Sequence, residues 1–368
     1  GLTAVCGGAT SVTQDDCDDT DGNRFPGNPG GFCDGADSDC DGGDELVQNT
    51  TQVSTYAGAT AADQLNAALA VAADNDVLEL CDSEVFEGPF AVDAAIDLVG
   101  TGLGATFTQL SGGEPSILTV NATGDVFVSN ASFLGQSDSA AAFGGCLNLE
   151  AGDVDLNVVD MEGCSASEGG AIHIAGSGSL DWTTGTCLLS SATTANGGCV
   201  SSSGTVTLTE VTLTANYAAL AGGGLYIADD AGNTTWSTGE CSQNNSLSGG
   251  CFYAGQNTNV ELGSGLIIAG DLVPPTYPDV PESNEAQLTG NGNQLVTLGV
   301  VTAREYMTAW PSVGAAPQDI WIGAGGEFCW VEVGPTFPSI VSIQTLGGDE
   351  AVLGDVYCNA ATCSAACP

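Results

Sequence analysis

Apolar and polar positions alternate in short runs through the middle of the chain, and one such run recurs. Each copy is a double glycine followed by a short apolar segment, and the copies are GGCLNL (144–149), GGAIHI (169–174), GGCVSS (197–202), GGGLYI (222–227) and GGCFYA (249–254). Their first residues are 25, 28, 25 and 27 positions apart. Short strands joined by glycine turns at such a period predict a solenoid with one coil per repeat.

Alternation with a period of two predicts which side chains face the interior. One expected inward column contains Leu147, Ile172, Val200, Leu225 and Phe252. A second alternating strand follows in each repeat, with the expected inward pairs Val154/Leu156, Leu180/Trp182, Val206/Leu208, Thr234/Trp236 and Val260/Leu262. Five residues further on we expect a third inward column of Met161, Cys187, Leu213, Cys241 and Ile267. The same offset upstream links Val128 to Phe133 and Leu98 to Leu103.

The segments on either side of the repeats differ from them in pattern. Residues 59–73 place Leu65, Leu69 and Ala72 on one face, which predicts an amphipathic helix before the first coil. We expect coils over 74–302, interrupted by a proline-rich loop at 271–286. Residues 303–368 hold short strand-like runs and four cysteines, which predict a small disulfide-bearing β cap or subdomain.

A helix followed by a first coil resembles the start of right-handed parallel β-helices of the pectin-lyase-like superfamily. The GGA(I/L) repeats are similar to those of polymorphic outer-membrane proteins and related β-helical surface proteins. This resemblance covers about residues 59–270. It implies an all-β fold, a right-handed parallel β-helix of about 7–8 coils with an N-terminal capping helix. The arginine or lysine base of pectate lyases and the Asp-Asp, Gly-His-Gly and Arg-x-Lys motifs of polygalacturonases are not found in the repeats, so the resemblance implies no activity.

Charge narrows the classes of function. The chain has 46 acidic residues, no lysine and two basic residues, Arg24 and Arg304, for a net charge of -44. Such a surface repels phosphate backbones and anionic lipid, so nucleic-acid and membrane-surface binding are excluded. No apolar stretch is long enough to span a membrane. Because the chain starts at Gly1 without a methionine or signal peptide, we expect a mature, secreted protein at the cell surface.

The first 48 residues form an acidic, cysteine-containing segment. Asp37-x-Asp39-x-Asp41-Gly42 matches the opening of an EF-hand loop, but Gln48 replaces the closing glutamate. The run DCDDTD, a Pro-Gly turn and CDGADSDCDG resembles a metal-binding repeat of secreted bacterial surface proteins. Hard oxygen ligands favour Ca²⁺, and the alternative is a solvated acidic segment. The expected ligands are Asp16, Asp18, Asp19, Asp21, Asp34, Asp37, Asp39 and Asp41.

Fifteen cysteines with a single histidine and no CxxC pair indicate disulfides rather than zinc. Cys146, Cys199 and Cys251 occupy one column on alternate coils, about 9.6 Å apart, which is too far for a disulfide. We therefore predict pairs between columns: Cys187–Cys199, Cys241–Cys251 and Cys146–Cys164. With four cysteines near each end of the chain, Cys81 is left over.

Two outward-facing sets of residues are candidates for chemistry. Asp155 and Asp181 lie on adjacent coils, about 5 Å apart in their backbones, and retaining glycosidases use two carboxyl groups at a similar separation. The alternatives are solvated aspartates or a shared calcium ion. The second set is a polar and aromatic strip that can stack sugars or meet a neighbouring subunit: Asn148, His173, Ser201, Tyr226 and Tyr253.

The sequence therefore favours an extracellular, non-catalytic structural protein, stabilised by calcium and self-associating into a surface filament or layer. One alternative is a polysaccharide-binding or polysaccharide-cleaving β-helix that uses the Asp155 and Asp181 face. Another is an adhesin or passenger module of a larger surface protein.

Overall fold

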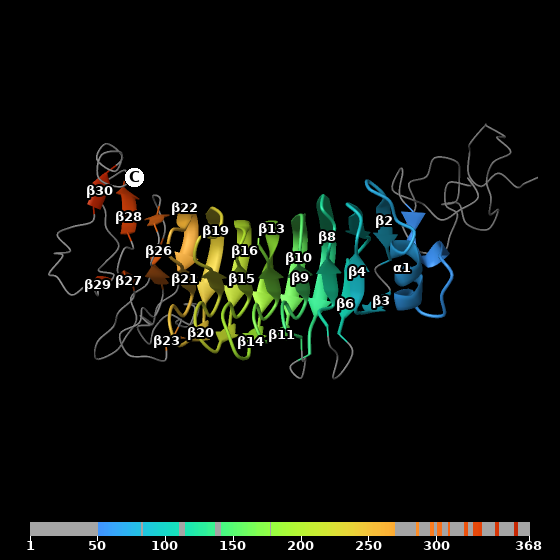
Figure 1. Cartoon of the computed structure of the whole chain (residues 1–368), viewed down its shortest axis with the longest axis horizontal. Helices are drawn as coiled ribbons and strands as arrows, with labels where there is room; N and C mark the ends of the chain where they lie inside the picture. The colour runs from blue at the N-terminus through green and yellow to red at the C-terminus, as the bar shows by residue number, and fades with distance from the viewer. Residues whose placement is uncertain are drawn as a thin grey trace, which may run out of the picture.

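The computed structural model of the chain describes residues 51–81, 84–109, 115–136, 141–176 and 178–268, and beyond them only short strands between 285 and 359. These residues form a parallel β-solenoid of about 8 turns whose coils stack into a rod (Figure 1). Every strand pairing in this part of the chain is parallel, and one α-helix lies at the N-terminal end. The predicted solenoid is confirmed. No helix in these residues is long and apolar enough to cross a membrane.

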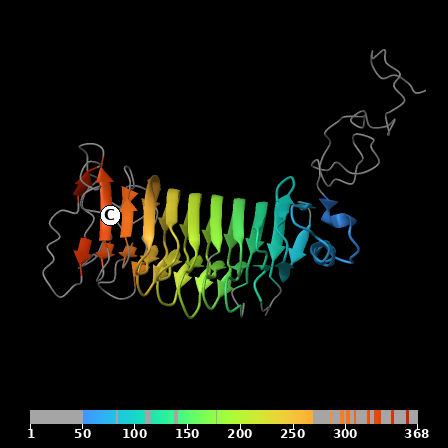
Figure 2. The same cartoon turned by 45° about the horizontal axis from the view of Figure 1, so that its top comes forward.

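Three sheets run along the rod; the coils from β9 (Leu147–Leu149) to β22 (Asn259–Ile268) contribute strands to all three, whereas the earlier coils contribute to two of them. The largest sheet has 15 strands: β1 (Thr51–Gln52), β2 (Val77–Leu80), β3 (Val85–Glu87), β5 (Asp97–Gly100), β6 (Ala105–Thr108), β8 (Asp125–Leu134), β10 (Asp153–Glu162), β13 (Ser179–Leu188), β16 (Thr205–Thr214), β19 (Thr234–Ser242), β22 (Asn259–Ile268), β25 (Val300–Ala303), β26 (Thr308–Ala309), β28 (Glu327–Glu332) and β30 (Tyr357–Asn359). Its long strands lie side by side in both views (Figure 2).

The other two sheets consist of shorter strands. The 10-stranded sheet contains β4 (Phe90–Val92), β7 (Leu118–Val120), β9 (Leu147–Leu149), β12 (Ile172–Ile174), β15 (Val200–Ser202), β18 (Leu225–Ile227), β21 (Phe252–Ala254), β24 (Leu295–Thr297), β27 (Ile320–Ile322) and β29 (Ile343–Thr345). The 5-stranded sheet contains β11 (Ser165–Ala166), β14 (Ser191–Ala192), β17 (Tyr217–Ala218), β20 (Asn245–Ser246) and β23 (Glu285–Ala286). Strands β27 to β30 continue two of the sheets into the region expected to be a C-terminal β cap.

The helix α1 (Ala61–Leu69) covers the N-terminal end of the core, next to the short 3-10 helix η1 (Val53–Thr55). It is shorter than the predicted 59–73: a capping box starts it after Thr60, and it ends at Leu69. The Thr60 side chain accepts a hydrogen bond from the Asp63 amide, and the Asp63 carboxylate accepts one from the Thr60 amide. Leu65 is fully buried, while Leu69 and Ala72 pack partly buried against the core.

The inward columns are confirmed with two exceptions. Leu103 is 95% exposed, and Phe107 takes its expected place opposite Phe133 because residues 101–104 turn outward between β5 and β6. At the other end of the repeats, Ile268 rather than Ile267 pairs with Cys241 and is buried. A register shift in β22 adds one residue there, and such a bulge moves the next side chain to the opposite face.

The double glycines serve two physical purposes. The first glycine of each pair has a positive φ, between 48° and 69°, which other residues adopt at a cost. The second glycine lies against the neighbouring coil: a Cβ on Gly170 would be 2.1 Å from the Gly198 carbonyl oxygen. A residue with a side chain would therefore push adjacent coils apart.

The three predicted disulfides, Cys146–Cys164, Cys187–Cys199 and Cys241–Cys251, are all present, with Cα–Cα distances of 5.5, 6.2 and 5.9 Å. Their column alternates large and small residues, since Ala171 and Gly224 occupy the coils between them. A Cβ on Gly224 would come within 3.3 Å of the Cys241 sulfur. Cys81 is also disulfide-bonded, so the expectation that it is left over is wrong.

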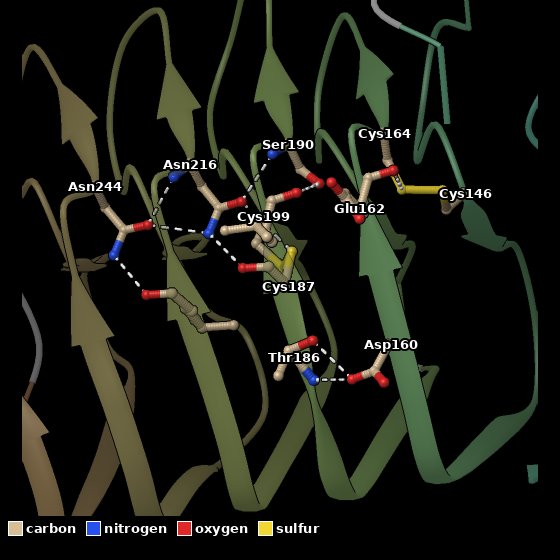
Figure 3. Close-up of a disulfide and its surroundings, with 12 residues drawn as sticks. Cys146, Asp160, Glu162, Cys164, Thr186, Cys187, Ser190, Cys199, Asn216 and Asn244 are labelled. Atoms are coloured by element: carbon tan, nitrogen blue, oxygen red, sulfur yellow. Dashed lines mark hydrogen bonds between the residues drawn. A yellow bond between two sulfur atoms is a disulfide. The ribbon is translucent and has the colours of Figure 1, made fainter. Parts of the chain in front are cut away.

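Buried asparagines close the same corner of the coils by hydrogen bonding (Figure 3). The Asn216 Nδ2 donates to the Cys187 carbonyl and to Asn244 Oδ1, both at 3.0 Å, and Asn216 Oδ1 accepts from the Ser190 amide at 2.9 Å. Asn244 Nδ2 donates to the Leu213 carbonyl at 2.8 Å. Each amide thus ties its own coil to the preceding one, and no polar atom of this ladder needs water.

We expect Asn216→Ala to destabilise the rod by about 2–3 kcal/mol, because it leaves a buried carbonyl and a buried amide without partners. Chemical denaturation followed by circular dichroism measures this loss. The control is Asn233→Ala, an exposed asparagine in the loop just before β19, which should unfold like the wild type. Equal stability of the two variants would contradict a structural role for the ladder.

Candidate functional site

The predicted calcium ligands, Asp16 to Asp41, lie outside the described residues. Within the part of the chain that the structure describes, no group of three or more His, Cys, Asp or Glu side chains is arranged to hold a metal ion. Both arginines also lie outside it, so the described coils contain no lysine or arginine. The chemistry of these coils is therefore that of carboxylates, hydroxyls, amides and aromatic rings.

Five outward aspartates gather on the large sheet, and we call them the carboxylate ladder: Asp97, Asp125, Asp153, Asp155 and Asp181. Asp155 on β10 pairs directly with Asp181 on β13, as predicted, and both lie on the outer face of the sheet. Asp125 on β8 pairs with Asp153 one row away. The period-two alternation of the strands, with Val154 and Leu156 in the core, points these carboxylates outward.

The pKa is raised at two members of the carboxylate ladder, Asp155 and Asp97. Partial burial raises the pKa of Asp155, and the charges of Asp181, Asp125, Asp153 and Asp97 raise it further. Partial burial also raises the pKa of Asp97. The hydroxyl of Ser179 donates to Asp153, which balances part of that charge. Stacked carboxylates of this kind destabilise the folded chain unless cations gather at them.

The second candidate set lies on the 10-stranded sheet, and we call it the polar–aromatic strip: Asn148, His173, Ser201, Tyr226 and Tyr253. These residues are in register on five successive coils, from β9 to β21. The rings of Tyr226 and Tyr253 stack with centroids 5.3 Å apart. Asp155 and Asp181 belong to a different sheet, so the structure does not join the two sets into one site.

His173 is held by a chain of hydrogen bonds. Its Nδ1 lies 3.1 Å from Asn148 Oδ1, and Asn148 Nδ2 donates to Glu150 Oε1 at 3.2 Å. The tautomer that donates from Nδ1 makes this contact a hydrogen bond to the amide oxygen and leaves Nε2 as an acceptor. Burial lowers the pKa of His173, while Glu168 and Glu150 partly oppose that shift. Burial therefore favours the neutral form of the imidazole.

Two residues from the turns complete the strip, and sequence reasoning missed both. The Phe143 ring lies 4.5 Å from the His173 ring. Glu168 Oε1 accepts a hydrogen bond of 2.9 Å from the Ser201 hydroxyl. Both residues immediately precede a double glycine, and they pair with each other in an isolated bridge. Their shared position before a glycine pair is the sequence feature that could have identified them.

The phenol of Tyr226 stays protonated. Burial, together with the charges of Tyr253, Asp229 and Glu168, raises its pKa to about 12. The polar–aromatic strip therefore offers hydrogen-bond acceptors and aromatic rings, and carboxylates lie near it. It contains no lysine or arginine side chain. No protein-family model, curated protein or solved structure matches the chain.

We expect Asp155→Asn to stabilise the rod by about 0.5 kcal/mol at low salt, because it removes a like-charge pair across adjacent strands. Thermal unfolding at low and high ionic strength measures the gain, which should shrink as salt screens the repulsion. Because the pKa of Asp155 is raised in the folded state, acidification into the range where it binds a proton should likewise stabilise the wild type relative to the variant. A destabilised variant would contradict this account of the ladder.

We expect His173 to titrate below its ordinary pKa of 6.5, and Glu168→Gln to lower that pKa further by removing a nearby anion. Lowering the pH through about 6.5 therefore weakens the fold, since the unfolded imidazole binds a proton that the folded one does not. NMR titration of the single histidine measures the pKa directly. The control Glu87→Gln removes an exposed carboxylate on β3 and should leave the pKa unchanged. A pKa at or above 6.5 would contradict the prediction.

Proposed function

We propose that the chain is an extracellular, non-catalytic structural protein, a calcium-stabilised subunit of a surface filament or layer. The observation that carries this proposal is the carboxylate ladder, where Asp155 stands directly over Asp181 in a region without lysine or arginine. Multivalent cations stabilise such a surface because they neutralise several carboxylates at once. The acidic segment 1–48, with its expected calcium ligands, adds to the same demand for cations.

The disulfides support an oxidising location. The three pairs in the coils are fully buried, and Cys81 is bonded as well. Disulfides persist outside the cell and are rare in the reducing cytosol. A rod whose coils are clipped in this way resists local unfolding, which suits a load-bearing element of the cell surface.

The capping helix bears on how subunits would meet. Because α1 covers the N-terminal end of the core, strands of a second copy have no open edge of hydrophobic core to extend there. We therefore propose that contact between subunits runs through the acidic segment and calcium rather than through stacking of coils at this end.

A polysaccharide-cleaving β-helix is the second candidate function, and the register of Asp155 with Asp181 is the observation that favours it. A retaining mechanism needs one protonated and one ionised carboxyl group, and the raised pKa of Asp155 makes it the acid of such a pair. Release of reducing ends from neutral or acidic glycans that is lost in both Asp155→Asn and Asp181→Asn would support this function over the structural one.

The structural proposal predicts particles whose size depends on calcium. Electron microscopy and light scattering of the full chain in millimolar CaCl₂ should show filaments or sheets that dissolve when a chelator is added. A NaCl control at matched ionic strength separates specific ions from general screening. Monomers in both calcium and chelator would overturn the assembly, whereas filaments indifferent to chelation would overturn the role of calcium.

A further inference from the structure

The outer face of the first coil is covered by another part of the chain. Glu79 on β2 lies between Leu78 and Leu80, which point into the core, so its own side chain points outward. It is nevertheless 0% exposed, and Gln52, which pairs with it from the edge strand β1, is 5% exposed. Polar side chains on the outside of a rod are buried in this way only when something lies over them.

The rest of this row shows how an uncovered outer face differs. Val99 on β5, Ser129 on β8 and Asn157 on β10 follow Glu79 in register, and all three are partly exposed. The described elements that pack against β2 are β1 and β5 beside it in the sheet and η1, whose Val53 belongs to the core. These elements flank β2 or close its end, so they do not cover its outer face.

A disulfide bears on which segment the cover is. Cys81 directly follows β2 and is disulfide-bonded, while the six cysteines between residues 141 and 268 pair among themselves. The partner of Cys81 is therefore a cysteine of the acidic segment 1–48 or of the C-terminal region. Strands β28 and β30, which contain Cys329 and Cys358, lie at the opposite end of the rod (Figure 1).

The length of the rod excludes the C-terminal cysteines. In the large sheet β28 is nine strands beyond β2 and β30 is ten, which puts them about 43 and 48 Å away. Cys367 is eight residues beyond Asn359, the end of β30, and eight extended residues span about 28 Å at most. A disulfide needs Cα atoms within about 7 Å of each other. The candidates for the partner of Cys81 are therefore the four cysteines of the acidic segment: Cys6, Cys17, Cys33 and Cys40.

The charge of Glu79 points to the same segment. Fully buried carboxylates in proteins are paired, most favourably with a cation. The described coils contain no lysine or arginine. Arg304 directly follows β25, which is eight strands or about 38 Å from β2, so it is too far away. The remaining arginine is Arg24, in the acidic segment.

We propose that the acidic segment docks on the outer face of the first coil, where Arg24 pairs with Glu79 and a disulfide to Cys81 holds the contact. Glu79 and Cys81 are two positions apart, so alternation places both on this face. Among the described strands β1 pairs with β2 alone, and the docked segment shields that edge of the sheet. The contact brings the expected calcium ligands to the N-terminal end of the rod, but it does not depend on calcium-linked assembly.

Trypsin is a selective probe of this contact, because it cleaves after lysine and arginine and the chain offers it only Arg24 and Arg304. The full, oxidised chain is digested, and the fragments are quantified by mass spectrometry after quenching and reduction. Cleavage after Arg24 should be about tenfold slower in the wild type than in Glu79→Gln, since a docked segment has to open before a protease can cut it. Cleavage after Arg304 should proceed at the same rate in both proteins.

The matched control is Glu87→Gln, which removes an exposed carboxylate from β3 and should leave both rates within about twofold of the wild type. All digestions contain the same CaCl₂ concentration, so that calcium affects every arm equally. Equal cleavage after Arg24 in the wild type and in a folded Glu79→Gln protein would overturn the ion pair, as would equal acceleration by Glu79→Gln and Glu87→Gln. Circular dichroism of each variant establishes that it is folded.

The disulfide is tested on the wild-type chain, so this test does not depend on whether a variant folds. Pepsin digestion at low pH, where thiols do not exchange, keeps the native pairing for mass spectrometry. We expect a peptide containing Cys81 joined to a peptide of the acidic segment. A bond from Cys81 to a cysteine of 303–368, or a free thiol at Cys81, would overturn the docking. Either result would leave the test of calcium-linked assembly by microscopy unaffected.

Discussion

The register between successive coils is the constraint on which the rest of this protein depends. Parallel strands of adjacent coils pair residue for residue, so Leu147, Ile172 and Val200 stack in one column. A slip of one residue would turn every side chain of a coil to the opposite face, and the alternation of large apolar and polar residues makes that slip costly. Because the interior is fixed in this way, each outward row is fixed with it, including both candidate sites.

The corners of the coils need more than apolar packing, since the chain turns there and leaves backbone groups inside. The side chains of Asn216 and Asn244 satisfy such groups by hydrogen bonding, and the disulfide Cys187–Cys199 links the chain covalently at the same corner (Figure 3). A buried polar ladder is stabilising only when all its members are paired. The small residues Ala171 and Gly224 between the disulfides show how closely the coils approach.

The same stacking that builds the core concentrates charge on the surface. Asp155 and Asp181 occupy one row because their strands are in register, not because their charges attract. In the solenoid, a repeat in the sequence therefore places like charges in a row. Cations that gather at this row reduce the repulsion and so stabilise the folded chain. On the 10-stranded sheet the outcome differs, because the row from Asn148 to Tyr253 holds amide, hydroxyl and ring side chains and no carboxylate.

The sequence by itself determined the period of the coils, the inward columns and the three disulfides of the repeats. These follow from alternation and fixed spacing, which are local properties of the chain. It also placed Asp155 beside Asp181 and His173 in line with Tyr226. Only the tertiary structure showed where extra residues interrupt the alternation of inward and outward side chains. They leave Leu103 exposed in an outward turn and Ile267 exposed after a bulge. It alone brought Glu168 to Ser201 and Phe143 to His173, because these contacts join a turn of one coil to a strand of another, and local alternation does not specify how a turn folds back.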